Sequence, residues 1–150
     1  MIRYEKGDLL TVNDKYIAHG VNCMGTMGAG VALAIRLKYP TVYEEYYKFV
    51  MDSAKNGLSK KELLGKVFVS EVDDTRAILN IFSQERIGRN GKFVSYDALD
   101  LAFETIADNK QITSLSIPKI GAGLGGGNWE VIEKIIDYRL PDITVTVREL

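Results

Sequence analysis

The sequence predicts an α/β fold in which a mixed, mostly parallel sheet carries helices on both faces. Three observations lead to this prediction. Strand-like runs alternate with helical patterns through most of the chain, a hairpin interrupts them near the middle, and two glycine-rich loops each connect a strand-like run to a helix. The 150 residues suit a single domain, spanning 1–150, with a full-sized core.

The N-terminal part of the chain predicts two strands followed by a helix. A short strand-like run turns at Gly7-Asp8, and a second strand spans residues 16–21. After a loop with the sequence GTMGAG, apolar residues recur at helical spacing over 31–37. This helix must stop before Pro40, because proline disfavours helical backbone in the residue that precedes it.

The middle of the chain predicts a second helix and then the hairpin. Thr41 is the expected N-cap of this helix, and Gly57 is the expected stop. Its apolar face consists of Val42, Tyr46, Phe49 and Val50. The tyrosines around it, Tyr43, Tyr46 and Tyr47, are expected either in the core or on a contact surface. Two β-rich runs over 65–72 and 76–82, separated by a short polar turn, predict the hairpin.

The C-terminal part predicts alternating helices and strands. A polar loop over 83–93 leads to Ser95, which caps the next helix. The inner face of that helix consists of Leu99, Ala102, Phe103 and Ile106. A buried strand over 112–120 enters the second glycine loop, and a last helix and strand follow over 128–140 and 143–150.

The charge and cysteine content exclude several classes of protein. The formal net charge is -1, whereas a protein that grips DNA or RNA by neutralising phosphates is usually basic, so general nucleic-acid binding is not expected. The single cysteine, Cys23, forms no internal disulfide and is expected to serve packing. Without a leader pattern or an apolar run of bilayer length, we expect a cytoplasmic protein with no membrane partner.

The two glycine loops are the strongest functional signal. Glycine lets a ligand approach the backbone, and a strand-to-helix junction presents free N–H groups and the positive end of the helix dipole, which together bind phosphate. The second loop, GAGLGG over 121–126, fits a dinucleotide-binding pattern, but only one helix and one strand follow it. Used together, the loops predict a clamp for the two halves of one pyrophosphate. The alternative is that the glycines only form tight turns.

The segments GDLL, AHGVNCMGTMGAGVALAIRLKYP and LSIPKIGAGLGGGNW resemble, in order and spacing, the three signature segments of the macrodomain family. The resemblance covers nearly the whole chain. It is closest to the compact subgroup that includes ADP-ribose-1″-phosphate phosphatases and ADP-ribosyl-glutamate hydrolases. It implies a three-layer α/β/α macrodomain and a cleft for ADP-ribose.

The resemblance also implies roles for individual side chains. Asp8 would accept a hydrogen bond from the adenine amino group, with the Leu9 backbone nearby, although Asp8 also suits a plain turn. Asn22 would hydrogen-bond the distal ribose, since its amide both donates and accepts. His19 would act as an acid or base, or orient the substrate, whereas a lone histidine in a strand also suits a structural role.

The candidate catalytic residues are therefore His19 and Asn22. The candidate ligand-binding residues are Asp8, Leu9, Asn22, Gly28, Ala29, Gly30, Val31, Gly121, Ala122, Gly123, Leu124, Gly125 and Gly126. Trp129 is expected to anchor the core, and Lys119 is expected to be solvated unless it favours an anionic ligand. No cluster has metal-ligand spacing, so we expect neither a metal nor a cofactor.

The implied activity is hydrolysis of ADP-ribose 1″-phosphate to ADP-ribose and phosphate. One departure concerns the glutamate hydrolases, which carry a lysine and an aspartate where this chain has Gln84 and Gly125. Two alternatives are a non-catalytic reader of ADP-ribose, and a hydrolase that removes ADP-ribose from protein or nucleic acid with help from the loop Gln84 to Lys92. A dinucleotide-dependent oxidoreductase is a remote alternative, because no nicotinamide pocket is recognisable.

Overall fold

The computed structural model describes residues 1–88 and 91–149. In these residues a six-stranded sheet has the order β1-β6-β5-β2-β4-β3. The strands are β1 (Ile2–Lys6), β2 (Tyr16–Asn22), β3 (Val67–Asp73), β4 (Arg76–Gln84), β5 (Ser114–Ile117) and β6 (Thr144–Glu149). The helices are α1 (Gly30–Lys38), α2 (Pro40–Lys55), α3 (Tyr96–Asp108) and α4 (Trp129–Arg139), with short 3-10 turns at Leu9–Thr11 and Lys60–Leu63.

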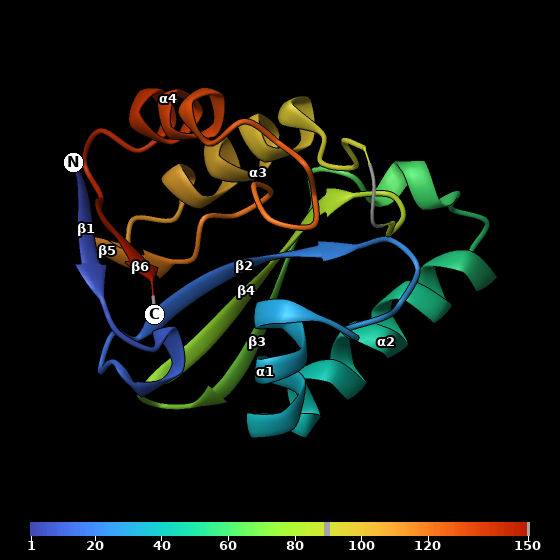
Figure 1. Ribbon diagram of the computed structural model, residues 1–150. Helices are drawn as coiled ribbons and strands as arrows, with labels where there is room; N and C mark the ends of the chain where they lie inside the picture. The colour runs from blue at the N-terminus through green and yellow to red at the C-terminus, as the bar shows by residue number, and fades with distance from the viewer. Residues whose placement is uncertain (89–90, 150) are drawn as a thin grey trace.

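The elements form three layers, as Figure 1 shows, with α3 and α4 on one face of the sheet and α1 and α2 on the other. Every strand pair is parallel except the β3–β4 hairpin. Each helical layer has its own apolar core: Phe103 and Ile132 belong to one, and Tyr46 and Phe82 to the other. The predicted three-layer α/β/α fold, mixed sheet and central hairpin are confirmed.

The helix ends agree with the sequence at one predicted cap and disagree at another. Ser95 caps α3, and its hydroxyl accepts a hydrogen bond from Ala98 N at 3.1 Å. The prediction for Thr41 is wrong, because α2 begins at Pro40 and Tyr39 is its N-cap. Proline suits the first helical position, since its fixed φ is helical and the missing N–H has no intrahelical partner there.

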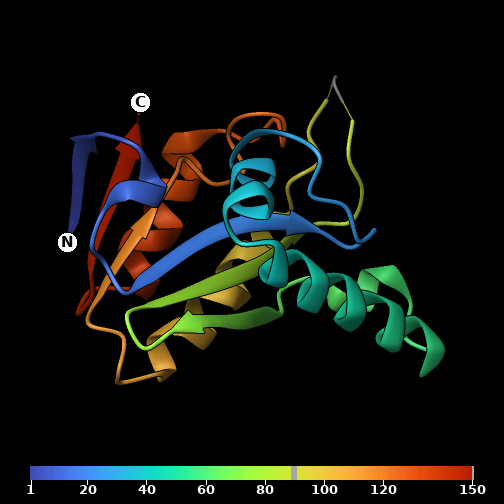
Figure 2. The same ribbon diagram turned by 90° about the horizontal axis from the view of Figure 1, so that it is seen from below.

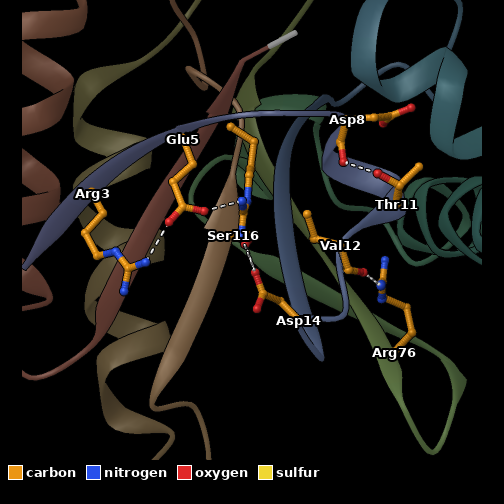
Figure 3. Close-up of polar contacts among 9 residues, drawn as sticks. Arg3, Glu5, Asp8, Thr11, Val12, Asp14, Arg76 and Ser116 are labelled. Atoms are coloured by element: carbon orange, nitrogen blue, oxygen red, sulfur yellow. Dashed lines mark hydrogen bonds and ion pairs between the residues drawn. The ribbon is translucent and has the colours of Figure 1, made fainter.

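The helical layer on the α1 and α2 side covers only part of its face. Figure 3 shows the polar contacts beside it, where the segment leading into β2 crosses the sheet. Glu5 accepts from Arg3 at 2.6 Å and also pairs with Arg148, while the Ser116 hydroxyl donates to Asp14. The Asp8 backbone carbonyl accepts from the Thr11 hydroxyl at 3.0 Å. A polar network therefore takes the place of a helix over β1, β6 and β5.

The topology brings both glycine loops to one edge of the sheet. β2 and β5 are parallel neighbours, so their carboxyl ends meet there. The chain leaves β2 toward α1 on one face and leaves β5 toward α4 on the other, so a crevice opens between the two connections. In residues 1–88 and 91–149, the helices are too short or too polar to cross a membrane.

Candidate functional site

A cleft of about 970 Å³ lies at the carboxyl ends of β2, β4 and β5. Figure 2 shows the loop after β5 beside the first turn of α1, and both contribute to its walls. The lining residues are His19, Gly20, Val21, Asn22, Thr26, Gly28, Ala29, Gly30, Val31, Ala32, Ser83, Gln84, Ile87, Gly88, Pro118, Lys119, Ile120, Gly121, Gly123, Leu124 and Gly125. The two predicted loops therefore share one cleft.

The first glycine loop ends at the open N-terminus of α1. Its N-cap is Ala29, which has no side chain that accepts a hydrogen bond. The backbone N–H groups of Gly30, Val31 and Ala32 therefore lie at the start of the helix, where no intrahelical acceptor exists. All three residues line the cleft, and the positive end of the α1 dipole adds to their attraction for an anion.

The second glycine loop is folded tightly on itself and on the neighbouring loop. The Gly121 carbonyl accepts from Gly127 N at 2.8 Å, and the Gly125 carbonyl accepts from Phe93 N and Val94 N. In the described part of the chain, the N–H groups of Gly123, Leu124 and Gly125 have no hydrogen-bond acceptor. These three residues line the cleft opposite the first turn of α1, so they supply a second set of donors.

The glycines of the two loops have different surroundings. Gly126 has φ +71°, and a Cβ there would lie 2.1 Å from the Gly91 carbonyl oxygen, so the protein itself requires glycine at this position. Gly28 and Gly123 have no left-handed φ, and no atom of residues 1–88 and 91–149 lies within 4 Å of a Cβ built on either of them. Packing therefore does not explain glycine at these two positions, and both of them line the cleft.

Asn22 lies at the end of β2 with its side-chain amide fully engaged. The Nδ2 group donates to Thr26 Oγ1 at 2.8 Å and to the Thr26 carbonyl at 3.1 Å. The Oδ1 atom accepts from Met24 N at 2.9 Å and lies 3.0 Å from the Tyr46 hydroxyl. The amide thus shapes the first loop, and both Asn22 and Thr26 line the cleft.

His19 also contributes to the lining of the cleft, although only 1% of its surface is exposed. Its Nε2 atom lies 2.7 Å from Asn80 Oδ1, and Asn80 Nδ2 donates to the Phe68 carbonyl at 2.8 Å. Nε2 is therefore the protonated ring nitrogen, and Nδ1 carries a lone pair. Nδ1 is buried and has no partner in residues 1–88 and 91–149. Burial lowers the pKa of His19 to about 4, so the ring is neutral at pH 7.

Four of the candidate ligand-binding residues lie outside the lining of the cleft, namely Asp8, Leu9, Ala122 and Gly126. Asp8 follows β1 and caps the turn Leu9–Thr11, with its Oδ1 atom accepting from Leu10 N at 2.9 Å. Leu9 is 6% exposed and belongs to the core under α1 and α2. The turn-forming role of Asp8 is confirmed, and its role toward adenine stays a prediction.

The cleft also contains side chains that the sequence did not single out. Ser83 and Thr26 add hydroxyl groups, and the exposed Ile87 belongs to the loop after β4. Residues 89–90 of the predicted loop Gln84 to Lys92 lie outside the described residues. Gln84 Nε2 donates to the Arg86 carbonyl at 2.9 Å, and its Oε1 atom lies 3.1 Å from a Cβ built on Gly125. The two positions that depart from the glutamate hydrolases are thus neighbours in space.

Cys23, Lys119 and Trp129 each make contacts that stabilise the fold. Cys23 is buried, which raises its pKa to about 12. Lys119 forms an ion pair with Glu149 at 3.2 Å, and Trp129 packs half-buried against the core while its indole N–H donates to the Tyr4 hydroxyl. Among residues 1–88 and 91–149, no three His, Cys, Asp or Glu side chains come close enough together to hold a metal ion.

Comparisons with known proteins agree with this architecture. The chain is 29% identical to the DNA ADP-ribosyl glycohydrolase of Mycobacterium tuberculosis over 98% of its residues, but it spans only 42% of that relative. It is 28% identical to the ADP-ribose 1″-phosphate phosphatase of Candida albicans, covering 91% of this chain and 92% of that one. The structure of a macrodomain protein from Streptomyces coelicolor superposes with a TM-score of 0.80 at 30% identity, over 100% of this chain and 99% of that one. A family model for the macro domain matches residues 18–136, and this chain therefore belongs to the macrodomain family.

Proposed function

We propose that the cleft binds ADP-ribose and that the protein hydrolyses ADP-ribose 1″-phosphate to ADP-ribose and phosphate. The observation that carries this proposal is the pair of opposed glycine loops, each with N–H groups that have no acceptor among residues 1–88 and 91–149. Gly30, Val31 and Ala32 supply one set of donors, and Gly123, Leu124 and Gly125 supply the other. A pyrophosphate between them accepts hydrogen bonds from both walls, without the need for a cationic side chain.

The bare faces of Gly28 and Gly123 support the same proposal. None of the described residues occupies the space beside them, and both line the cleft. A ligand that approaches the backbone this closely needs residues without a Cβ. Asp8, which follows the carboxyl end of β1, would accept a hydrogen bond from the adenine amino group. It would use its second carboxylate oxygen, since Oδ1 already caps the turn.

At the opposite end, Asn22 and His19 would serve the distal ribose and its phosphate. Since the His19 ring is neutral at pH 7, it starts as an acceptor and not as an acid. Because Nδ1 is buried, a water must first enter beside it from the cleft, and Nδ1 would then accept a hydrogen bond from this attacking water. The water oxygen forms the new bond to phosphorus, the bond from phosphorus to the ribose oxygen breaks, and the water proton passes by way of His19 to the leaving oxygen.

A second candidate is removal of ADP-ribose from DNA. The relatives named DNA ADP-ribosyl glycohydrolase favour this activity, since the mycobacterial one matches 98% of this chain. Gln84 and Gly125 argue against a mechanism that needs an amine and a carboxylate at these positions, because neither residue supplies the group. The fungal phosphatase relatives, which match along nearly their whole length, favour the phosphatase instead. A reader of ADP-ribose without turnover needs only the cleft.

The test is calorimetric titration with ADP-ribose, followed by incubation with ADP-ribose 1″-phosphate and assay of free phosphate. Binding with phosphate release supports the phosphatase, and His19→Ala should then remove release while ADP-ribose still binds. Unchanged release by His19→Ala would exclude His19 from the reaction. Binding without release points to a reader, or to the glycohydrolase if ADP-ribosylated DNA is cleaved in a parallel assay. Absence of binding contradicts the clamp.

A further inference from the structure

Asn22 accepts hydrogen bonds from a tyrosine of α2 that does not line the cleft. Tyr46 of α2 is fully buried, and its ring packs against Phe82 with centroids 5.7 Å apart. Its hydroxyl donates to the Asn22 carbonyl at 2.6 Å and lies 3.0 Å from Asn22 Oδ1. One O–H group therefore contacts both the backbone and the side chain of the same residue.

These contacts fix the direction of the Asn22 amide. Oδ1 lies near three donors, because Met24 N at 2.9 Å and Thr26 N at 3.4 Å join the Tyr46 hydroxyl. With the carbonyl end held in this way, the Nδ2 group must lie on the opposite side. There it donates to Thr26 Oγ1 at 2.8 Å, on a residue that lines the cleft beside Asn22.

The Tyr46 hydroxyl is suited to remain a donor. Burial raises its pKa well above the usual range for tyrosine, so the group stays protonated under physiological conditions. By contrast, Tyr43 is only half-buried, and its hydroxyl donates to the Gly25 carbonyl of the same loop at 3.1 Å without contacting Asn22. The two tyrosines thus support one loop but differ in whether they touch its functional amide.

We propose that Tyr46 is a positioning residue for recognition of the distal ribose, which it directs through Asn22. The inference rests on the proposed binding of ADP-ribose. In the free protein the Thr26 hydroxyl accepts from Nδ2, and in the complex a hydroxyl of the distal ribose takes that place. The exchange keeps the number of hydrogen bonds constant, and it needs the amide to keep its direction while Thr26 releases it.

The experiment compares ADP-ribose with ADP, which contains the pyrophosphate and adenosine but lacks the distal ribose. Calorimetric titrations use the wild type, Tyr46→Phe, and Tyr43→Phe as the matched control. Tyr46→Phe keeps the ring against Phe82 and removes only the hydroxyl. We expect the Kd for ADP-ribose to rise about fivefold in Tyr46→Phe, the value for one hydrogen bond, while the Kd for ADP changes by less than about twofold. Tyr43→Phe should leave the ratio of the two Kd values unchanged.

A double-mutant cycle with Asn22→Ala separates positioning from general support. If Tyr46 acts through Asn22, then Tyr46→Phe has no further effect on the ADP-ribose to ADP ratio once Asn22 is alanine. Equal loss of both ligands in Tyr46→Phe, as from a partly unfolded protein, overturns the inference, and so does an unchanged ratio. Absence of ADP-ribose binding by the wild type overturns the proposed function itself and the inference with it.

Discussion

Two glycines in the second loop should respond in opposite ways to the same substitution. Gly126→Ala places a Cβ on a residue with φ +71°, and that atom would lie 2.1 Å from the Gly91 carbonyl oxygen and 2.9 Å from its carbon. Left-handed backbone costs an ordinary residue about 1–2 kcal/mol, and a contact this short forces the backbone of two loops apart. We therefore expect a loss of about 2–4 kcal/mol in the free energy of unfolding.

Gly123→Ala is the matched variant, because it adds the same methyl group three residues away. Its φ is not left-handed, and in the described part of the chain nothing lies within 4 Å of the new Cβ. Stability should therefore stay within about 0.5 kcal/mol of the wild type. If the open face of Gly123 meets the pyrophosphate, the methyl group should weaken ADP-ribose binding about tenfold, which corresponds to about 1.4 kcal/mol.

Thermal unfolding by circular dichroism and titration with ADP-ribose measure the two effects. For a domain of this size, the loss in Gly126→Ala corresponds to a decrease in Tm of about 5–15 °C. A Tm for Gly126→Ala equal to that of the wild type would refute the steric reasoning. Undiminished affinity in Gly123→Ala would show that the bare face of that residue does not meet the ligand.

Three further predictions concern the supports of the cleft. The pKa of His19 is about 4 in the folded protein, against the ordinary 6.5 of a histidine in the unfolded chain, so between these pH values only the unfolded chain binds the proton. The free energy of unfolding should therefore fall by about 3 kcal/mol as the pH decreases from 6.5 to 4. Urea titrations should show this loss in the wild type and should lack this part of it in His19→Asn. Asn80→Ala should lower the free energy of unfolding by about 1–3 kcal/mol in the same assay, since it leaves the buried His19 Nε2–H without its acceptor. Ser95→Ala should cost about 1 kcal/mol through loss of the α3 cap and leave the Kd for ADP-ribose unchanged, because Ser95 does not line the cleft.

The sequence predicted the sheet, the layers and the meeting of the glycine loops, because each depends on local patterns. Alternating strands and helices specify parallel pairing, and loops that follow parallel neighbouring strands share an edge. The cap at Ser95 could also be predicted, since its side chain forms a hydrogen bond with a residue three positions away. At the start of α2, the preference of proline for the first helical turn outweighed the capping preference of Thr41.

The partners of the site residues could not be predicted in the same way. His19 meets Asn80 because β2 and β4 pair in one particular register, which a single sequence does not reveal. Strict alternation along β2 would place Asn22 on the same face as Ala18, toward α3. A β-bulge shifts the pairing between Val21 and Asn22, and Asn22 contacts Tyr46 on the other side of the sheet instead.

The strand order also has a consequence for how the domain folds. β6 lies between β1 and β5, so among the described strands β1 pairs only with β6, and Glu5 and Arg148 lie 143 positions apart. Contacts of such sequence separation form late, because a long loop must close before they contribute. During folding β1 gains a neighbour in the sheet only when β6 is in place, whereas the strands that flank the cleft, β2, β4 and β5, can pair with one another earlier. The cleft is therefore expected to take shape before the sheet is complete.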